Sequence, residues 1–300
     1  MLVYLKLFLT AFFWGGTFIA GRSIAGTVGP FSAAFLRFTI ASACLLILCL
    51  KMEGRLPRVP GNKLGPVILL GMTGVFSYNV CFFKGLELIE AGRAAIIIAN
   101  NPIAITLAST LIFKERLTPV KFLGALLSVS GAIVVITRGD LASLFTRGLS
   151  LGELFIFGCV GSWVLYSLIG KTVMSSLSPL AAVTCSAVIG AMALSPFALT
   201  EGLTADWAGY GLSDWTSLVY LGFFGTVVGF VWYYQGIRAI GPSRASLFIN
   251  FVPISAVILA FFILGEPLTP SLAVGTALVC CGVYLTNRPS RAAAVQPART

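Results

Sequence analysis

The chain has 300 residues, of which 58% are hydrophobic and only 10% are charged, and it contains no histidine. Charged residues make up about a quarter of an ordinary soluble domain, so this composition excludes a soluble globular protein. A formal net charge of +10 could indicate a nucleic-acid partner, but the distribution of the basic residues along the chain argues against one.

Apolar stretches of about 20 residues follow one another along nearly the whole chain, and each is long enough to cross a bilayer. They must be helices, because every backbone polar group in the hydrocarbon region needs an internal partner. We therefore expect an all-α integral membrane protein with ten transmembrane helices and no sizeable soluble domain. The predicted spans are 4–21, 31–50, 65–83, 94–113, 119–137, 151–170, 179–199, 215–235, 244–264 and 270–287.

The basic residues are unevenly divided between the two sets of loops. If the N-terminus is cytoplasmic, most of the 20 lysines and arginines fall on the cytoplasmic side, as in proteins that follow the positive-inside rule. The net charge therefore indicates topology, with both termini cytoplasmic, and predicts no nucleic-acid partner. The residues on the cytoplasmic side are Lys6, Lys51, Arg55, Arg58, Lys63, Lys114, Arg116, Lys121, Lys171, Arg238, Arg244, Arg288, Arg291 and Arg299; those opposite are Arg22, Lys84, Arg93, Arg138 and Arg147.

The second half of the chain repeats the first. The stretch 85–132 recurs without a gap as 236–283, and the start of each half echoes the other, Trp14 matching Trp163. Because each copy has five spans, the second copy must enter the membrane from the opposite side, so the repeats are inverted. The informative matches in the long stretch are Gly85/Gly236, Arg93/Arg244, Pro102/Pro253, Glu115/Glu266, Thr118/Thr269, Pro119/Pro270, Gly124/Gly275 and Gly131/Gly282.

These matches divide the chain into a first five-helix repeat (1–137), a linker (138–150), a second and inverted repeat (151–287) and a tail (288–300). We expect the tail to be disordered. The loop around Glu115 carries Lys114 and Arg116, whereas its twin around Glu266 has lost both cations, as the positive-inside rule requires of an outward loop. Both glutamates are expected to cap helix N-termini or to pair with a cation.

Inverted repeats are typical of secondary transporters, whose substrate site lies near the midplane between the two halves. A duplicated structural bundle is the alternative. The Trp14-Gly15 start, the Pro30…Arg37 pair and the repeated Pro…Glu-x-Leu-Thr…Gly…Gly pattern resemble the EamA family of the drug/metabolite transporter superfamily, over residues 4–287.

The resemblance implies a ten-helix exporter of small metabolites in the bacterial cytoplasmic (inner) membrane. It implies a cavity formed by helices one to four and six to nine, with helices five and ten at the back. Within the family, the chain is most similar to bacterial exporters of aromatic and other amino acids. The sequence departs from its own symmetry at Arg37, which is Ser186 in the second copy, so any role of this arginine is confined to one half.

Aromatic and polar residues in mid-span are the candidates for substrate binding. Trp14 and Thr17 share one face of the first helix, and Trp163 and Tyr166 share the matching face of the sixth. Both tryptophans lie away from the interfaces where aromatic belts form, although packing is an alternative role. The third helix adds Tyr78, Asn79 and Phe82, and the eighth adds Tyr233, for which an interfacial belt is the alternative.

Arg37 and two spans that each contain a central proline complete the candidate site. Arg37 could bind a carboxylate or extend to the outer surface. Pro102 and Pro253 each remove a backbone hydrogen bond in mid-helix, which predicts a kink that could serve gating. Asn101 and Asn250 lie beside them and are candidates for binding an ammonium or hydroxyl group, with ordinary interhelical hydrogen bonding as the alternative.

What the chain lacks also limits its function. The seven cysteines have no metal-ligand spacing, so we expect no metal and no cofactor, and without a nucleotide-binding loop we expect no ATP-driven pump on this chain alone. Since histidine and clustered carboxylates are lacking, we expect no enzyme activity, with an intramembrane enzyme as the alternative. The spans lack central carboxylates, which favours facilitated export over proton antiport, with Glu153 left as a possible coupling group. We predict a monomeric or weakly oligomeric exporter of small neutral metabolites, foremost amino acids, that works by alternating access. The alternatives are carriers of purines, nucleotide-sugars or lipid-linked sugars.

Overall fold

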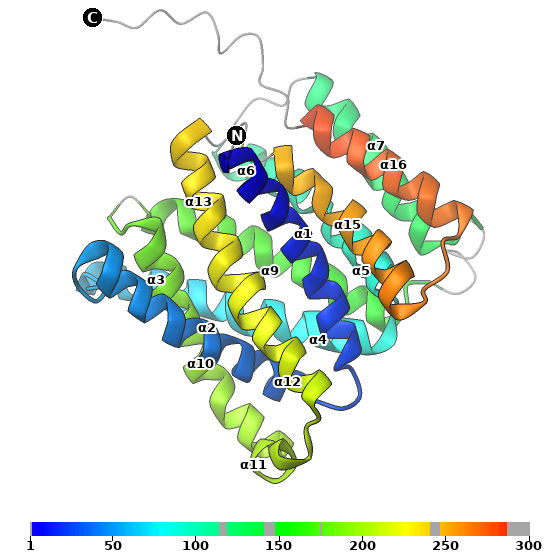
Figure 1. Ribbon diagram of the computed structural model, residues 1–300. Coiled ribbons are helices and arrows are strands. Elements are labelled where there is room, and N and C mark those ends of the chain that lie inside the picture. Colours follow the sequence, from blue (N-terminus) through cyan, green and yellow to red (C-terminus); the bar gives the residue numbers. More distant parts are fainter. Residues whose placement is uncertain (1, 114–118, 141–147, 175, 241–246, 287–300) are drawn as a thin grey trace, which may run out of the picture.

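The computed structural model describes residues 2–113, 119–140, 148–174, 176–240 and 247–286, and in these ranges the chain is helical and contains no strands (Figure 1). The helices are α1 (Leu2–Ser23), α2 (Pro30–Glu53), α3 (Leu64–Leu70), α4 (Tyr78–Leu88), α5 (Ala91–Ile98), α6 (Asn101–Phe113), α7 (Pro119–Ile136), α9 (Leu151–Val173), α10 (Pro179–Glu201), α11 (Leu203–Asp206), α12 (Leu212–Val219), α13 (Gly229–Ile240), α15 (Phe251–Leu259) and α16 (Pro270–Thr286).

Among the described residues, seven helices are long and apolar enough to cross a membrane. Two of them are built from joined pieces: α3 and α4 belong to one helix over Gly61–Leu88, and α12 and α13 to another over Leu212–Tyr233. The other three predicted spans are shorter apolar helices, Ala91–Ile105, Phe248–Leu264 and Pro270–Thr286. The structure therefore supports a multi-helix membrane protein, with seven helices of full spanning length and three shorter apolar helices among the described residues.

Two of the shorter helices are interrupted near a proline. In the fourth predicted span α5 ends at Ile98 and α6 begins at Asn101, just before Pro102. The ninth has a short 3₁₀ turn, Leu247–Asn250, ahead of α15 and Pro253. Proline lacks an N–H group and its ring clashes with the carbonyl four residues earlier, which explains why neither helix runs through unbroken.

Carboxylates from distant parts of the chain cap two helix N-termini. Glu266 accepts hydrogen bonds from the backbone N–H groups of Ala91 (2.7 Å) and Gly92 (3.0 Å), at the start of α5. Glu201 does the same for Phe31 and Ser32 at the start of α2. Free N–H groups and the helix dipole both favour an anion there. The predicted capping role of Glu266 is thus confirmed, whereas Glu115 lies outside the described residues.

The contact between α7 and α16 shows how the two halves of the chain pack against each other. Helices α7 and α16 lie side by side at one edge of the bundle (Figure 1). A Cβ atom built on Gly282 would lie 2.5 Å from the Gly124 carbonyl oxygen, and one built on Gly275 would lie 2.7 Å from the Gly131 carbonyl oxygen. The helices therefore run antiparallel and touch through reciprocal glycines, the small residues that bring membrane helices closest together.

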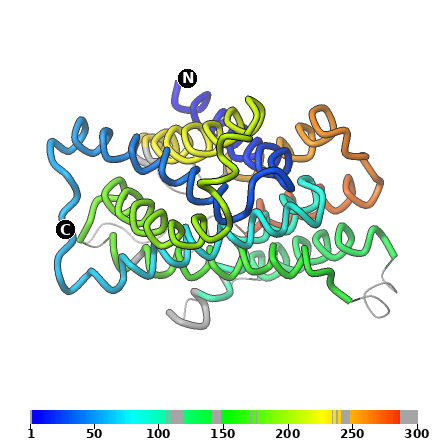
Figure 2. Tube along the Cα trace, turned by 90° about the horizontal axis from the view of Figure 1, so that it is seen from below, coloured from blue at the N-terminus to red at the C-terminus, as the bar shows by residue number. Residues whose placement is uncertain are grey.

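The same antiparallel relation recurs between α2 and α10, which pack along their lengths. Glu201 at the end of α10 meets the start of α2, and Glu53 at the end of α2 accepts a hydrogen bond of 2.5 Å from Ser178 at the start of α10. Seen from below, these helices lie on the opposite flank of the bundle from α16 (Figure 2). The remaining helices, among them α1, α4, α9 and α15, lie between the two antiparallel pairs and surround the interior.

Candidate functional site

A cavity of about 570 Å³ occupies the interior between the two halves of the chain. We call the end of the molecule where α1 begins and α9 ends the N-side, and the end where α1 stops at Ser23 and α9 starts at Leu151 the far side. On α9 the lining runs from Trp163 to Met174 and leaves out the first turns. On α10 it includes Ala182, close to that helix's start on the N-side. The cavity thus reaches toward the N-side and ends short of the far side.

Eleven of the thirteen residues that the sequence singles out line this cavity. The structure shows that these residues surround one cavity, and their binding of a substrate stays a prediction. They are Trp14, Thr17, Arg37, Tyr78, Asn101, Pro102, Trp163, Tyr166, Tyr233, Asn250 and Pro253.

Two aromatic groups form the walls. Trp163 lies 5.5 Å from Tyr78 and 5.3 Å from Tyr166, measured between ring centroids. Trp14, its counterpart in the first repeat, lies 5.6 Å from Phe230 and 5.4 Å from Tyr233. Tilted aromatic pairs at these distances are stabilising and rigid, because each ring has few rotatable bonds. The cavity is therefore bounded by firm, flat and mostly apolar surfaces.

The Trp14 indole is fixed by a hydrogen bond of 3.0 Å from its Nε1 to the carbonyl oxygen of Gly225. Gly225 belongs to a π-helical stretch, Tyr220–Val228, and the third predicted span has a matching stretch, Gly71–Ser77. The wider π-helical turn moves carbonyl groups out of their usual register, and such turns are frequent at functional sites. This irregular backbone supplies the acceptor that orients one of the two cavity tryptophans.

Arg37 is the one charged side chain among the described lining residues, and it is directed inward with 8% of its surface exposed. Its Nε donates to the Thr226 hydroxyl (3.3 Å) and its Nη1 to the Asn79 side-chain oxygen (3.0 Å). Both partners are neutral. Within the described ranges no carboxylate pairs with Arg37, and its Nη2 donates no hydrogen bond.

A buried guanidinium without a counter-ion is costly, because neutral partners only partly replace the water it has lost. The same guanidinium has donors left for a carboxylate, the group whose geometry matches it best. Arg37 therefore gives a cavity with no other charged residue in its described lining one strong point of attraction for an anionic group.

Asn79 and Phe82 lie behind the cavity wall rather than in it. Asn79 is 1% exposed, and its Nδ2 donates to the Val75 carbonyl oxygen at 2.8 Å while its Oδ1 accepts from Arg37. Phe82 is also 1% exposed, and it stacks against the back of Tyr78 with ring centroids 6.1 Å apart. Neither residue is part of the cavity lining, so the geometry assigns them to positioning Arg37 and Tyr78.

Asn101 and Asn250 both line the cavity beside the two helix interruptions. In the part of the chain that the structure describes, the Oδ1 atoms of both side chains are buried and lack a hydrogen-bond partner. An unsatisfied buried acceptor is unfavourable by roughly 1–3 kcal/mol. The side-chain oxygens of both asparagines therefore make no hydrogen bonds between helices within the described ranges.

The aromatic run on the eighth predicted span is divided between two environments. Tyr233 lines the cavity, whereas Trp232 packs on Phe13 (5.8 Å) and beneath the Lys6 ammonium (5.9 Å). The side chain of Tyr234 lies outside the described residues. Sequence reasoning missed Phe230, although it precedes Tyr233 by three residues and therefore shares its helix face. It also missed Thr226 and Gly225, whose contribution depends on a π-helical turn that no sequence pattern marks.

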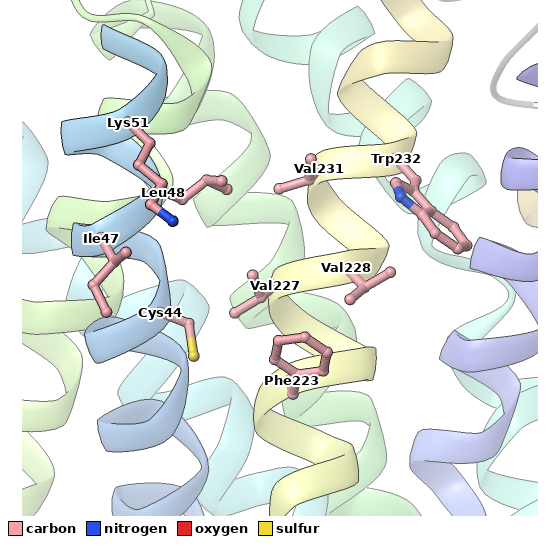
Figure 3. A pocket seen from close by; sticks show the side chains of 9 residues that line it. All are labelled: Cys44, Ile47, Leu48, Lys51, Phe223, Val227, Val228, Val231 and Trp232. Carbon is pink, nitrogen blue, oxygen red and sulfur yellow. The ribbon is translucent and has the colours of Figure 1, made fainter. Parts of the chain in front are cut away.

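A second hollow of about 350 Å³ lies between α2 and α13 (Figure 3). The described side chains that line it are mostly aliphatic or aromatic, and Lys51 is the one charged residue among them. Ile47 and Phe223 in its lining are 54% and 39% exposed, so this hollow belongs to the outer surface of the bundle. No grouping of three metal-binding side chains occurs among the described residues, and none is near either hollow.

Comparison with known proteins gives one consistent result. The model of the EamA-like transporter family matches residues 1–137 and 150–288. The uncharacterized transporter YyaM of Bacillus subtilis is 31% identical over 285 residues, which cover 95% of this chain and 93% of YyaM. A probable terminal-alkyne amino-acid exporter of Streptantibioticus cattleyicolor is 30% identical, with 94% of this chain and 92% of the exporter covered.

A solved crystal structure is similar to the whole chain, with a TM-score of 0.66 and coverage of 95% of this chain and 96% of the other. The sequence identity is 24%, so this similarity concerns the fold alone. It shows that the overall arrangement of the helices has an experimental counterpart.

Proposed function

The chain belongs to the EamA-like transporter family, and from that premise we propose that it exports small neutral amino acids, aromatic ones included, by alternating access through the central cavity. The observation that carries the proposal is the make-up of the cavity. Its two aromatic walls suit a flat apolar side chain, and the single unpaired guanidinium of Arg37 suits one carboxylate.

The proposed topology is ten membrane helices in two inverted five-helix repeats, with both termini in the cytoplasm of a bacterium and the protein in its cytoplasmic membrane. The antiparallel contacts of α7 with α16 and of α2 with α10 support this arrangement, as does the bias of the basic residues. In this topology the N-side is cytoplasmic. The cavity then reaches toward the cytoplasm, where an exporter loads its substrate.

The lining also argues against carriers of phosphorylated substrates. A nucleotide-sugar or a lipid-linked sugar carries two or more negative charges, for which several cavity cations would be expected, yet the described lining has one. A zwitterionic amino acid brings a single carboxylate and a single ammonium group. The unpartnered side-chain oxygens of Asn101 and Asn250 could accept from that ammonium after a small rotation.

Transport into proteoliposomes tests the proposal. A panel of labelled amino acids, purines and phosphorylated sugars should give uptake of aromatic and other neutral amino acids, and little uptake of phosphorylated compounds. Uptake confined to phosphorylated sugars would overturn it. Repeating the assay with and without a pH gradient tests the coupling: we expect facilitated transport, with equal initial rates in the two conditions.

We expect Trp163→Ala to raise the KM for phenylalanine about tenfold. The indole offers a large flat face, and losing ~50 Å² of apolar contact with the substrate is worth about 1.3 kcal/mol. Initial rates of uptake over a range of phenylalanine concentrations measure the effect. Trp207→Ala is the matched control, because Trp207 is 57% exposed and does not line the cavity. An unchanged KM with normal amounts of folded protein would reject the role of Trp163.

A further inference from the structure

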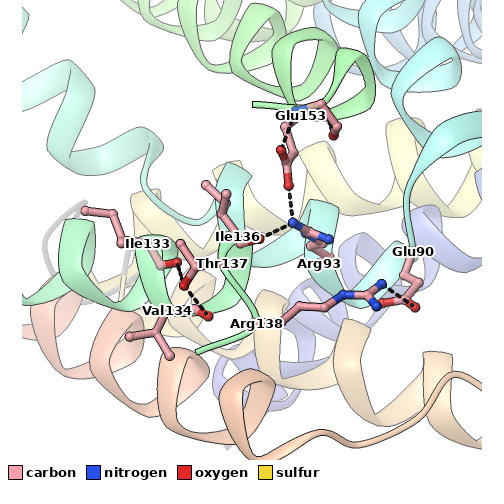
Figure 4. Close-up of polar contacts among 9 residues, drawn as sticks. Glu90, Arg93, Ile133, Val134, Ile136, Thr137, Arg138 and Glu153 are labelled. Atoms are coloured by element: carbon pink, nitrogen blue, oxygen red, sulfur yellow. Dashed lines mark hydrogen bonds and ion pairs between the residues drawn. The ribbon is translucent and has the colours of Figure 1, made fainter. Parts of the chain in front are cut away.

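An ion pair at the far side joins the two halves of the chain. Arg93 of α5 contacts the carboxylate of Glu153 of α9, and the same guanidinium donates to the carbonyl oxygen of Ile136 at the end of α7 (Figure 4). Glu153 is 2% exposed and Arg93 15%. Three helices from the two repeats are thus tied together beyond the closed end of the cavity.

The helices beside this ion pair are packed much more closely than at the cavity. A Cβ atom on Gly152 would lie 2.7 Å from Ile89, and one on Gly85 would lie 2.5 Å from Ile156, so α4 and α9 touch tightly near the far side. Further along α9, a Cβ atom on Gly170 would meet nothing closer than 3.6 Å. The Arg93–Glu153 pair therefore lies where α9 closes on its neighbours, and the cavity opens where α9 moves away from them.

The repeat does not reproduce this ion pair. Arg93 matches Arg244 in the second copy, but the register that aligns Trp14 with Trp163 places Tyr4 opposite Glu153. Tyr4 is 48% exposed and lies 6.1 Å from Phe248, ring to ring. A carboxylate is present at the far side and a tyrosine at the matching position on the N-side, so the two copies differ in the residue that carries the charge of Glu153.

From these observations we propose that Arg93 and Glu153 form the gate of the far side, and that the missing carboxylate at Tyr4 makes the resting protein favour the state that is closed there and open toward the N-side. The inference rests on the inverted-repeat organisation of the proposed function. In an inverted repeat the two states are related by exchanging the roles of the halves, so their energies differ only through residues that break the symmetry. A buried ion pair that exists in one state alone is such a difference.

The consequence is a directional bias. A protein that rests open toward the cytoplasm presents an empty cavity to the substrate it has to export, and opening outward requires Arg93 and Glu153 to separate. Removal of the Glu153 charge should raise the population of the outward-open state. A carboxylate at Tyr4, the position that matches Glu153 in the repeat, should have the same effect, because closure of the N-side would then have a counterpart of the Glu153 carboxylate.

Native cysteines report on the gate without any substrate. Cys159 is fully buried between α9 and α4, where its thiol donates to the Tyr78 carbonyl oxygen, six residues along α9 from Glu153. Cys49 is equally buried between α2 and α10, next to Thr184, and serves as the internal reference. The rate at which a small hydrophilic maleimide modifies each cysteine can be followed by peptide mass spectrometry on the full-length protein in detergent.

We expect Glu153→Gln to speed the modification of Cys159 by roughly tenfold and to leave Cys49 unchanged, since a tenfold population shift corresponds to ~1.4 kcal/mol, the size of one lost interaction. Glutamine keeps the capping of Ser150 possible, so the helix start is preserved. Glu90→Gln is the matched control: Glu90 pairs with Arg138 at the same end, but at 3.6 Å and with both side chains exposed, and such pairs contribute little.

Tyr4→Glu gives a second and independent test, because its position is half-exposed and the Arg93–Glu153 pair stays intact in this variant. It should also speed the modification of Cys159 and not that of Cys49. The gate is overturned if neither variant changes Cys159, if Glu90→Gln has the same effect as Glu153→Gln, or if Cys49 responds as strongly as Cys159. The measurement needs no substrate, so its outcome does not depend on the identity of the exported compound.

Discussion

Arg37→Met is expected to abolish measurable export of amino acids while the protein remains folded. The guanidinium is the single charge on the described cavity wall and has no counter-ion there, so the carboxylate of a substrate would be its only strong partner. Removing one member of a buried, hydrogen-bonded charge pair costs about 2–5 kcal/mol of binding, which is roughly 30-fold to several thousandfold in affinity.

The stability of this variant separates a binding role from a structural one. Methionine fills a similar volume, and the desolvated, unpaired charge is itself unfavourable in the empty protein. Its loss leaves the Asn79 oxygen without a donor, an opposing effect of ~1–3 kcal/mol. We therefore expect a melting temperature within a few degrees of the wild type, measured in detergent.

Arg138→Gln is the matched control for Arg37→Met, because it removes an arginine that is 68% exposed and outside the cavity. It should transport like the wild type. Retention of normal transport by Arg37→Met would show that the guanidinium does not contact the substrate. A drop in melting temperature of 15 °C or more would instead identify Arg37 as a structural residue, and would remove the support it gives to the proposed substrate class.

Gly282→Ala should destabilise the fold by about 1–3 kcal/mol, the largest effect on stability that we expect from adding one methyl group. The new Cβ would lie 2.5 Å from both the Gly124 carbonyl oxygen and the Ser128 backbone nitrogen. Both obstacles are backbone atoms, so the clash can be relieved only by moving α7 and α16 apart. Thermal unfolding in detergent, followed by tryptophan fluorescence, measures the change.

Gly161→Ala provides a control with the opposite sign. Gly161 lies within α9, and a Cβ atom there would meet nothing within 4 Å. Alanine favours a helix over glycine by about 0.5–1 kcal/mol, so this variant should be unchanged or slightly more stable. Equal behaviour of the two variants would contradict the close glycine-mediated contact between α7 and α16.

Hydrophobic runs and the internal repeat predicted much of the architecture. They located the helices, and the matching of Trp14 with Trp163 indicated that each half contributes an aromatic residue to one cavity. These features follow from local composition and from self-similarity, which a single sequence displays directly.

The sequence could not reveal features that depend on partners far along the chain. Asn79 was predicted to line the cavity because a polar group in a span needs a partner, but its partner is Arg37 and it lies behind the wall. The Arg93–Glu153 pair joins residues from different repeats, and nothing near either residue marks the other. The π-helical stretches arise from packing, which hydropathy alone does not encode, whereas the interruptions of the fourth and ninth helices occur near Pro102 and Pro253, where the sequence predicts a kink.

Counterflow of labelled phenylalanine into proteoliposomes is the most direct test of the central claim, that the cavity recognises an amino acid through its aromatic walls and through Arg37. Vesicles are preloaded with unlabelled phenylalanine or with phenethylamine, which keeps the ring and the ammonium group but lacks the carboxylate. Internal phenylalanine should drive rapid accumulation of the label, and phenethylamine should drive none. Equal accumulation with both compounds, or none with either, would contradict the claim.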